Sequence, residues 1–467
     1  MSKILWEGKE VVQIINGHGP INWSAFGVSI DTRTIKKGDI FFALAGPNFD
    51  GHQFINEAIK KGAAAVISNA PALKHRNKVI VVNDVLRALI SLGKFSRQRN
   101  KGKVIAITGS SGKTTVKEIL AMLLNCYGKT HFSLSSYNNK IGVSLSLARM
   151  PEDSDFSIFE IGMNDYDEIS FLSKIVKPDI ALVNNVGNAH IEFFNSKREI
   201  EKEKLQIIDG INSGGSLILN DKISIIQSVK NYSKKNNISL KKFGLDHKSN
   251  YFLRNYKYSP KASLVEAIIA KNNLSYKIFA PGLHMALNSL AALSVCEILR
   301  LPVKNVSEKI LKFTPIKGRG LTYSVCLDNK NLKIIDESFN ANPESMISSI
   351  QLLDEVDFYD DKRKILILGD MLELGKFSKN FHIEIAKFIE KTSISLVFCS
   401  GNEMKYLWEN LPYDKKGAYT QKPDELIKPI MEKINNNDIL LIKGSSGSKI
   451  KLVLDYFEEE KLIRSIA

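Results

Sequence analysis

The chain has 467 residues, of which 44% are hydrophobic, a composition that excludes a mostly disordered chain and a length that predicts about three domains. Its apolar runs are far shorter than the ~18 residues that cross a bilayer, and Met1–Gly17 lacks the order of a signal peptide, so we expect a soluble protein without membrane insertion. The formal net charge of +15 would attract anions of any kind, but the Lys-rich stretches lack the interleaved aromatic residues of single-strand binders, and we interpret most of this charge as solvated surface.

The order of elements predicts an α/β fold with three domains. The first covers residues 1–98 and ends near the polar, basic stretch Ser96–Gly102, which we interpret as a linker. In residues 99–314, short β-rich runs alternate with helical patterns, which is typical of βαβ units and a parallel sheet. A second alternating series follows Thr314–Gly318, where Pro and Gly interrupt the pattern, and predicts a separate α/β domain over residues 315–467.

The strongest local signal is a Gly-Lys-Thr loop between an expected strand and an expected helix. The strand covers Val104–Ile107, and apolar residues from Val116 to Leu124 recur at helical spacing, so the N-terminal amides of the helix would point at the loop. The loop consists of Gly109, Ser110, Ser111, Gly112, Lys113, Thr114 and Thr115. Such a loop binds nucleotide phosphates: Lys113 would neutralise the β- and γ-phosphates, and the Thr114 hydroxyl would bind magnesium. The alternative is a chance Gly-Lys-Thr in a plain turn, since the full P-loop pattern would have glycine at position 107.

Two further residues are expected on the same edge of the central sheet. A magnesium-bound nucleotide needs another carboxylate, which in a doubly wound sheet comes from the C-terminal end of a neighbouring strand. Glu160 fits because it ends the apolar run Phe156–Phe159, although an edge glutamate without a role would look the same. The next expected strand, Ile180–Val183, leads to a loop that contains His190 and so places a histidine on the same edge.

Lys204 stands out in a predicted helix near Lys197–Ile208. Its spacing puts it on the apolar face with Ile200 and Ile207, where a buried ammonium is costly and tends to lose its proton. One explanation is snorkelling, in which the stem is buried and the head reaches water. The other is that the neutral amine has reacted with carbon dioxide, which gives an anionic carbamate that could bind a metal ion opposite His190.

Several later motifs are weak singly but should share one edge of their sheet. Asp336 follows the expected strand Leu332–Ile335 and precedes the loop that runs to Pro343. Further motifs of this kind are Gly282–Asn288, Gly318-Arg319, Gly369-Asp370 and Lys443–Gly447. If their edge faces the P-loop, the active site is an interdomain cleft that closes over ATP.

Taken together, these motifs resemble those of the Mur ligase family, whose members are ATP-dependent amide-forming enzymes of bacterial cell-wall synthesis. The resemblance covers nearly the whole chain. Within the family, Asp336–Pro343 and Leu368–Gly375 are similar to motifs of the ligase that adds D-alanyl-D-alanine to UDP-N-acetylmuramoyl-tripeptide. The N-terminal runs Ile30–Arg33, Gly38–Gly46 and Asp50–His52 resemble its UDP-sugar domain. The resemblance implies a UDP-sugar-binding N-terminal domain, a central P-loop ATPase domain and a C-terminal Rossmann-like ligase domain.

The resemblance also implies roles for particular residues. Catalysis would depend on Lys113, Glu160, His190 and Lys204. The ligands of two magnesium ions would be Thr114, Glu160, His190 and a carbamylated Lys204. The residues expected to bind ATP, besides the P-loop, are Asn288 by the adenine, Arg319 near the phosphates and Asp336 by the ribose. The residues expected at the substrate are Thr32, Arg33, Gly46, His52, Asn138, Asn139, Asn340 and Asn342.

The chain departs from the family pattern at five positions. Glu337 and Phe339 stand where Asp and Tyr are usual. Ser446 and Lys451 replace an Arg and a Glu around the Lys-Gly-Ser loop, and Asp167 replaces a Gly.

The resemblance implies a route to an amide bond. Joining a carboxylate to an amine in water is uphill, so ATP would first convert the substrate's terminal carboxylate into an acyl phosphate, with Lys113 and two magnesium ions stabilising the charge. The amine of D-alanyl-D-alanine would then attack the acyl carbon, and loss of phosphate would leave the UDP-muramoyl-pentapeptide. No residue stands out as the base for the incoming ammonium, and the third residue of the acceptor peptide, lysine or diaminopimelate, stays open.

Three other functions fit parts of the sequence. Another ligase of the same family would use a different amino donor, and a basic P-loop protein could use hydrolysis to remodel nucleic acid. A catalytically inactive relative would only bind substrate, but the intact set of Lys113, Glu160, His190 and Lys204 argues against it. We expect a monomer without a nucleic-acid partner. The four cysteines form no CxxC pair, which excludes a disulfide framework and fits the reducing cytoplasm.

Overall fold

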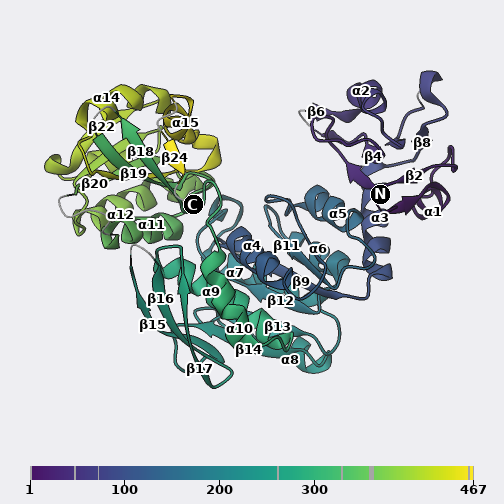
Figure 1. Ribbon diagram of the computed structural model, residues 1–467, viewed down its shortest axis with the longest axis horizontal. Helices are drawn as coiled ribbons and strands as arrows, with labels where there is room; N and C mark the ends of the chain where they lie inside the picture. The colour runs from purple at the N-terminus through teal and green to yellow at the C-terminus, as the bar shows by residue number, and fades with distance from the viewer. Residues whose placement is uncertain are drawn as a thin grey trace.

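The computed structural model describes residues 3–46, 49–71, 73–259, 262–327, 330–356, 362–460 and 463–465. Three larger sheets follow one another along the chain, and Figure 1 shows the N-terminal and C-terminal domains at opposite ends with the central domain between them. The expected α/β class with three domains and parallel sheets is confirmed.

The N-terminal domain is built on a four-stranded parallel sheet with the order β3-β4-β7-β8. Its strands are β3 (Gly27–Ser29), β4 (Asp39–Phe42), β7 (Ala65–Ser68) and β8 (Val79–Val81). Its helices are α1 (Gly8–Ile14), α2 (Ile55–Lys60) and α3 (Val85–Arg99). Ile40, Phe41 and Phe42 are all fully buried, as expected for a parallel strand covered on both faces.

The segment interpreted as a linker is instead the end of helix α3 and its attachment to the central domain. Arg97 Nε donates to the carbonyl of Val176 at 2.9 Å, and Asn100 Nδ2 donates to the carbonyl of Ser154 at 2.9 Å. Helix α3 also packs along helix α5 (Lys140–Ala148) of the central domain. The linker prediction was wrong because the polar side chains that suggested it bind backbone carbonyls of the next domain instead of water.

The central domain contains a nine-stranded sheet with the order β10-β11-β9-β12-β13-β14-β15-β16-β17. The three predicted strands correspond to β9 (Lys103–Thr108), β11 (Phe156–Glu160) and β12 (Ile180–Val183). The parallel part also contains β10 (Thr130–Phe132), β13 (Ser216–Asn220) and β14 (Ser239–Gly244), which we did not predict. Three strands that we did not predict extend it as an antiparallel group: β15 (Tyr251–Lys257), β16 (Ser263–Ile269) and β17 (Asn272–Ile278). The strand order reverses beside β9, so the loop after β9 lies at the switch point where such sheets bind ligands.

The C-terminal domain contains a seven-stranded sheet with the order β22-β21-β20-β23-β19-β18-β24. Its strands are β18 (Leu321–Leu327), β19 (Lys330–Glu337), β20 (Lys364–Gly369), β21 (Leu396–Ser400), β22 (Lys416–Thr420), β23 (Ile439–Lys443) and β24 (Ile463–Ser465). The four strands predicted from apolar runs correspond to β19, β20, β21 and β23, which pair in parallel. Strand β18 pairs antiparallel with β19 and with β24.

The helices predicted from Val116 and near Lys197–Ile208 are both present. Those of the central domain, besides α5, are α4 (Lys113–Leu124), α6 (Glu168–Val176), α7 (Lys197–Leu205), α8 (Gln227–Lys235), α9 (Leu283–Ile298) and α10 (Val303–Glu308). Those of the C-terminal domain are α11 (Pro343–Glu355), α12 (Ser378–Glu390), α13 (Met404–Glu409), α14 (Ile427–Lys433) and α15 (Lys451–Glu459). The helix expected near Lys197–Ile208 ends at Leu205 and continues as a 3-10 helix over Gln206–Gly210. Within the described ranges, no helix is long and apolar enough to cross a bilayer.

Candidate active site

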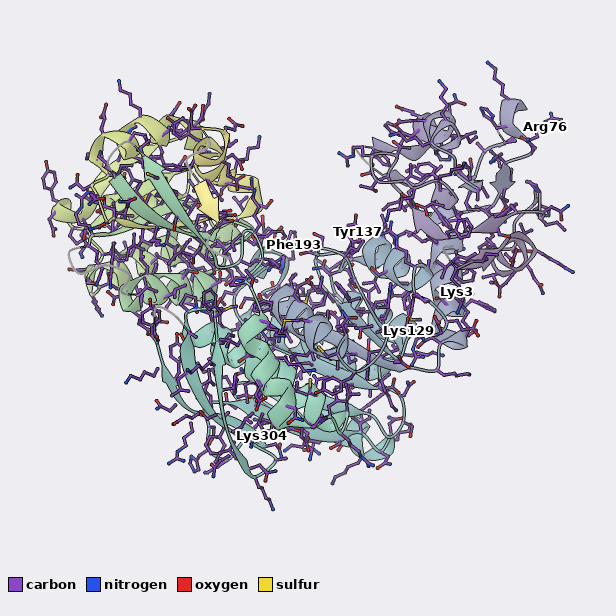
Figure 2. The ribbon with its side chains drawn as sticks, in the orientation of Figure 1. Lys3, Arg76, Lys129, Tyr137, Phe193 and Lys304 are labelled. Atoms are coloured by element: carbon purple, nitrogen blue, oxygen red, sulfur yellow. The ribbon has the colours of Figure 1, made fainter. Side chains whose placement is uncertain are left out.

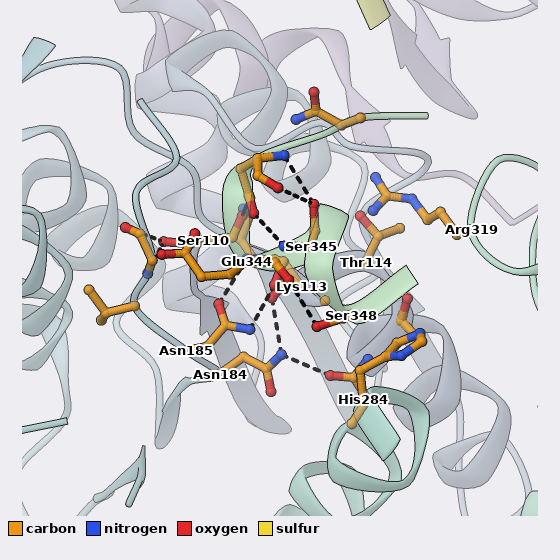
Figure 3. A pocket seen from close by; sticks show the side chains of 18 of the residues that line it. Ser110, Lys113, Thr114, Asn184, Asn185, His284, Arg319, Glu344, Ser345 and Ser348 are labelled. Carbon is orange, nitrogen blue, oxygen red and sulfur yellow. Dashed lines mark hydrogen bonds between the residues drawn. The ribbon is translucent and has the colours of Figure 1, made fainter. Parts of the chain in front are cut away.

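A cavity of about 470 Å³ lies between the central and C-terminal domains, and Figure 3 shows part of its lining. The sequence-predicted residues that line it are Ser110, Ser111, Gly112, Lys113, Thr114, Thr115, Asn138, Asn139, Glu160, His190, Asn288, Arg319, Asn340 and Asn342. The strand-end loops of the two domains therefore face each other, as expected for an interdomain site.

The P-loop is held in shape by two asparagines from other elements. Gly112 has a left-handed backbone, with φ of 75°, and an added Cβ would lie 2.5 Å from Asn184 Nδ2 and 2.6 Å from Asn288 Oδ1. The Asn184 amide donates to the carbonyl of Ser111 at 3.0 Å and to Asn288 Oδ1 at 2.9 Å, as Figure 3 shows. Only glycine fits at position 112, and Asn288, predicted beside the adenine, supports the loop through Asn184.

Lys113 begins helix α4 at the floor of the cavity. Its Nζ donates to the carbonyl of Gly109 at 2.6 Å, a contact within the loop itself. Burial lowers the pKa of Lys113, while the charge of Glu160 opposes this shift. A phosphate bound beside Lys113 would favour the charged ammonium, because a nearby anion stabilises the protonated amine. The loop, the ammonium and the helix N-terminus together form an anion-binding arrangement.

Thr114 and Glu160 meet as the sequence predicted. Thr114 Oγ1 donates to Glu160 Oε2 at 2.8 Å, and Asn138 Nδ2 donates to Glu160 Oε1 at 2.8 Å. Both Thr114 and Glu160 are buried, and Glu160 ends strand β11, the neighbour of β9. A hydroxyl and a carboxylate are oxygen ligands suited to magnesium. The described residues contain no cluster of three or more His, Cys, Asp or Glu suited to a metal ion, so phosphate oxygens and water would have to complete the coordination.

Lys204 is buried in helix α7 and has no hydrogen bond or ion pair in the part of the chain that the structure describes. Lys204 is 2% exposed, which argues against snorkelling into bulk water. Burial lowers its pKa well below the usual value, and the nearby charge of Lys113 lowers it further, against the opposing effect of Glu203. Lys204 does not line the cavity itself. A neutral amine close to the P-loop lysine is the state that these surroundings favour.

His190 lines the cavity and has a left-handed backbone, with φ of 63°. Its Nδ1 lies 2.5 Å from Oε2 of Glu373, which belongs to the C-terminal domain. Nδ1 does not meet the full geometry of a hydrogen bond, so we describe the contact as an ion pair. The contact with His190 lowers the pKa of Glu373, with burial of the carboxyl opposing it.

Arg319 joins the C-terminal domain to the P-loop side of the cavity. Its Nη2 donates to Ser136 Oγ at 3.1 Å, and its guanidinium lies 3.9 Å from the ring centroid of Phe339. The ring of Phe339 supports Arg319 by a cation–π contact that a tyrosine would also provide. Ser136, whose hydroxyl lies 3.4 Å from Thr114 Oγ1, was missed although the predicted Asn138 and Asn139 follow it closely in sequence.

Asp336, predicted at the ribose, does not line the cavity. It is fully buried and accepts hydrogen bonds from the Gly318 amide at 2.6 Å and from the Ser338 hydroxyl at 2.6 Å. The carboxylate therefore holds the turn that carries Arg319. Its neighbour Glu337 lines the cavity instead, 3.5 Å from the Nζ of Lys443.

Glu344 was also missed, although it is the main polar contact between helix α11 and the central domain. Its carboxylate accepts from the Asn188 backbone amide at 2.9 Å and from Asn188 Nδ2 at 2.7 Å, and it lies 3.8 Å from the Nζ of Lys197. Asn342 caps the same helix by accepting from the Ser345 amide at 2.9 Å. The sequence indicates that a helix begins at Pro343, but this pattern does not reveal which residues the first turn of the helix contacts.

The remaining departures from the family pattern have local explanations. Asp167 has a left-handed backbone with φ of 60°, a conformation that suits the glycine it replaces. Lys451 forms an ion pair with Asp455 along its own helix, and neither Lys451 nor Ser446 lines the cavity.

The structure does not bring the predicted N-terminal substrate residues to the cavity, which Thr32, Arg33, Gly46 and His52 do not line. Arg33 is exposed and paired with Asp31 at 2.7 Å, and His52 Nδ1 lies 2.6 Å from Asp50 Oδ1. Figure 1 shows their domain at the opposite end from the C-terminal domain.

The chain matches family models along most of its length. These are the Mur ligase family catalytic domain over residues 26–101, the Mur ligase middle domain over 107–296 and the Mur ligase glutamate ligase domain over 324–446. Among solved structures, MurF from Acinetobacter baumannii is 25% identical with a TM-score of 0.85, covering 97% of this chain and 99% of that one. MurF ligase from Thermotoga maritima in complex with ADP is 26% identical with a TM-score of 0.78, covering 93% of this chain and 97% of that one.

A curated protein is also similar to this chain over nearly its full length. The UDP-N-acetylmuramoyl-tripeptide--D-alanyl-D-alanine ligase of Rickettsia prowazekii (strain Madrid E) is 34% identical over 438 residues, which are 92% of this chain and 95% of the relative. Identity at this level over nearly the full length of both proteins, together with the three domain matches, shows that this chain belongs to the Mur ligase family.

Proposed function

We propose that the protein is an ATP-dependent ligase that adds D-alanyl-D-alanine to UDP-N-acetylmuramoyl-tripeptide. The observation that carries this proposal is the cavity in which a P-loop lysine, a Thr–Glu pair and side chains of the C-terminal domain converge. The name of the Rickettsia prowazekii relative supports the substrates, and the ADP complex of the Thermotoga maritima relative supports the use of an adenine nucleotide.

In the proposed reaction, the substrate carboxylate attacks the γ-phosphate of ATP and forms an acyl phosphate with release of ADP. Lys113 stabilises the charge that develops on the transferred phosphoryl group, and the amides of the P-loop hold the phosphates. The dipeptide amine then attacks the acyl carbon, and phosphate leaves. Arg319 is positioned by Ser136 and Phe339 to approach phosphate oxygens from the C-terminal side.

Magnesium fits the residues on the central side of the cavity. Thr114, Glu160, His190 and a carbamylated Lys204 would hold two ions, which supply charge neutralisation at the phosphates. Burial without a partner supports the carbamate, because it keeps the Lys204 amine unprotonated and able to combine with carbon dioxide.

The substrate would extend from the N-terminal domain to the cavity. We assign the domains to residues 1–98, 99–314 and 315–467, with Thr32, Arg33, Gly46 and His52 binding the UDP-sugar part. The cavity residues proposed for the peptide part are Asn138, Asn139, Asn340 and Asn342. We further propose a cytoplasmic monomer.

The reaction is tested by ADP release measured with each substrate left out in turn. Rapid turnover should require both UDP-N-acetylmuramoyl-tripeptide and an amine, with D-alanyl-D-alanine preferred over single amino acids. Equal ADP release without either substrate would refute a ligase. DNA-stimulated ADP release that needs no carboxylate substrate would instead indicate a nucleic-acid motor.

The carbamate is tested by Lys204→Ala, with the exposed neighbour Lys202→Ala as the matched control. Lys204→Ala should lose most activity and regain part of it when a short-chain carboxylic acid fills the vacated anionic position. Labelled bicarbonate should give a carbamate carbon signal in the parent and in Lys202→Ala but not in Lys204→Ala. A parent protein without this signal, together with full activity of Lys204→Ala, would leave an unmodified lysine.

A further inference from the structure

The stretch Leu368–Gly375 belongs to the C-terminal domain, yet its second half contacts the central domain. It leaves strand β20 and continues through the 3-10 helix η6 (Gly375–Phe377), which packs against the 3-10 helix η3 (Ile191–Phe193) directly after His190. Figure 2 shows Phe193, from this turn, on the side of the central domain that faces the C-terminal domain. None of the roles proposed above uses this contact.

The loop is anchored at consecutive backbone groups. The Met371 amide donates to Nε2 of the buried His382 at 3.3 Å, and the Leu372 amide donates to Ser445 Oγ at 2.9 Å. On the other side, the Glu192 amide donates to the carbonyl of Glu373 at 3.1 Å. The conformation of residues 371–373 is therefore fixed from both domains.

Glu373 and His190 meet with unusual backbones. Glu373 has φ of 61° and His190 has φ of 63°, a left-handed conformation that costs free energy in residues other than glycine. Gly375 leaves little room beside this contact, because an added Cβ would lie 3.1 Å from Glu192 Cγ. The arrangement aims the Glu373 carboxylate at His190 Nδ1, at 2.5 Å.

We propose that Glu373 is a positioning residue for His190, supplied by the C-terminal domain to the central domain. A carboxylate at Nδ1 favours the tautomer that carries its proton there, which leaves Nε2 as the nitrogen able to bind a cation. A carboxylate behind a metal-binding histidine also orients the ring. The inference rests on the proposed role of His190 and adds that this role depends on the position of the C-terminal domain.

The test measures binding of Mn²⁺ to the full chain with a non-hydrolysable ATP analogue, by electron paramagnetic resonance of the free ion. Glu373→Ala and Glu373→Gln should weaken one Mn²⁺ site by roughly 10- to 100-fold, the usual range for removal of a residue behind a metal ligand. In ligase assays both variants should regain activity at high Mg²⁺, because the defect is in cation affinity.

Two controls separate positioning from other effects. Glu192→Gln removes an exposed carboxylate from the same turn without touching His190, and should bind Mn²⁺ like the parent. Glu344→Gln weakens another polar contact of the same domain junction, and with the ATP analogue at saturating concentration it should leave Mn²⁺ affinity within about twofold, because Glu344 does not touch His190. Equal weakening by Glu344→Gln and Glu373→Gln would show a general effect of domain contact and overturn the proposal.

His190→Ala distinguishes failure of this inference from failure of the proposed metal site. If His190→Ala weakens Mn²⁺ binding but Glu373→Ala does not, Glu373 has no positioning role and the metal site stands. If His190→Ala itself binds Mn²⁺ like the parent, the proposed metal site and this inference both fail. Thermal unfolding of each variant shows that the folded chain is being compared.

Discussion

The central domain meets its two neighbours in different ways. Towards the N-terminal domain it shares an apolar core, which continues from Trp6 into Leu145 and Ala148 of helix α5. Trp6 is 1% exposed, its indole donates to the carbonyl of Ala148 at 2.8 Å, and the Arg99 guanidinium lies 3.8 Å from its ring centroid. Towards the C-terminal domain an apolar cluster is also shared, for example by Ile191 and Met346, but this junction encloses a cavity, and polar side chains such as Glu344 and Arg319 reach across its rim.

The difference indicates which junction can move. Separating Trp6 from helix α5 would expose a buried aromatic side chain and leave a buried indole N–H without a partner. Separating Glu344 from Asn188 exchanges hydrogen bonds for bonds to water at a small net cost. In the proposed site ATP enters between the central and C-terminal domains, so the junction around the cavity is the one suited to opening.

The largest effect on stability is expected from Trp6→Ala. Loss of a buried tryptophan should lower the free energy of unfolding by about 3–5 kcal/mol, because the cavity and the lost contacts lie at the shared core. Chemical denaturation measures this change, and Trp23→Ala is the control, since the Trp23 indole binds only the nearby carbonyl of Pro20. An equal loss in both variants would contradict a special role of Trp6 at the junction.

Lys113→Ala should lose activity but keep its stability, in contrast to Trp6→Ala. Removing the charge that stabilises the transferred phosphoryl group should slow turnover by roughly 10²- to 10³-fold, the cost of losing one electrostatic group in an active site. The midpoint of thermal unfolding should stay near that of the parent, because the one hydrogen bond of Nζ among the described residues is to the Gly109 carbonyl of the same loop. Substantial ligase activity in Lys113→Ala would refute the P-loop assignment.

Glu344→Ala tests the polar junction. Loss of the Glu344 carboxylate leaves the half-exposed Asn188 without its charged hydrogen-bond acceptor. We expect this to reduce kcat/KM for ATP by about tenfold, equivalent to ~1.4 kcal/mol. The unfolding free energy should fall much less than in Trp6→Ala. Glu390→Gln, at an exposed end of helix α12, is the control, and a larger stability loss in Glu344→Ala than in Trp6→Ala would reverse the comparison of the two junctions.

The smallest effect concerns His131, which belongs to strand β10 and contacts helix α5. Its Nε2 lies 2.8 Å from the carbonyl of Ser146, and burial lowers its pKa from 6.5 to about 4. The unfolded state takes up the proton first, so stability is full above pH 6.5 and is lost as pH falls toward 4. Between these values, the unfolding free energy of His131→Asn should depend less steeply on pH than that of the parent. Equal slopes would show that His131 is not held neutral.

Short-range patterns in the sequence determined a large part of this protein. Strand β9, the glycines at 109 and 112 and the apolar face of α4 form one continuous segment, so the P-loop could be predicted from spacing alone. The same holds for Glu160 at the end of β11 and for the parallel strands β19, β20, β21 and β23. In each case the determining interactions lie within a strand, a turn or a helix, which is the range that periodicity reports.

Only the tertiary structure decided how the domains meet. The polar end of helix α3 resembled a linker because the carbonyls that it binds, such as Val176, are distant in sequence. Asp336 is buried because its carboxylate accepts a hydrogen bond from the backbone amide of Gly318. Glu373 contacts His190 because the C-terminal domain packs against the central domain. Such contacts depend on long-range packing, which brings together polar groups whose partners no local pattern identifies.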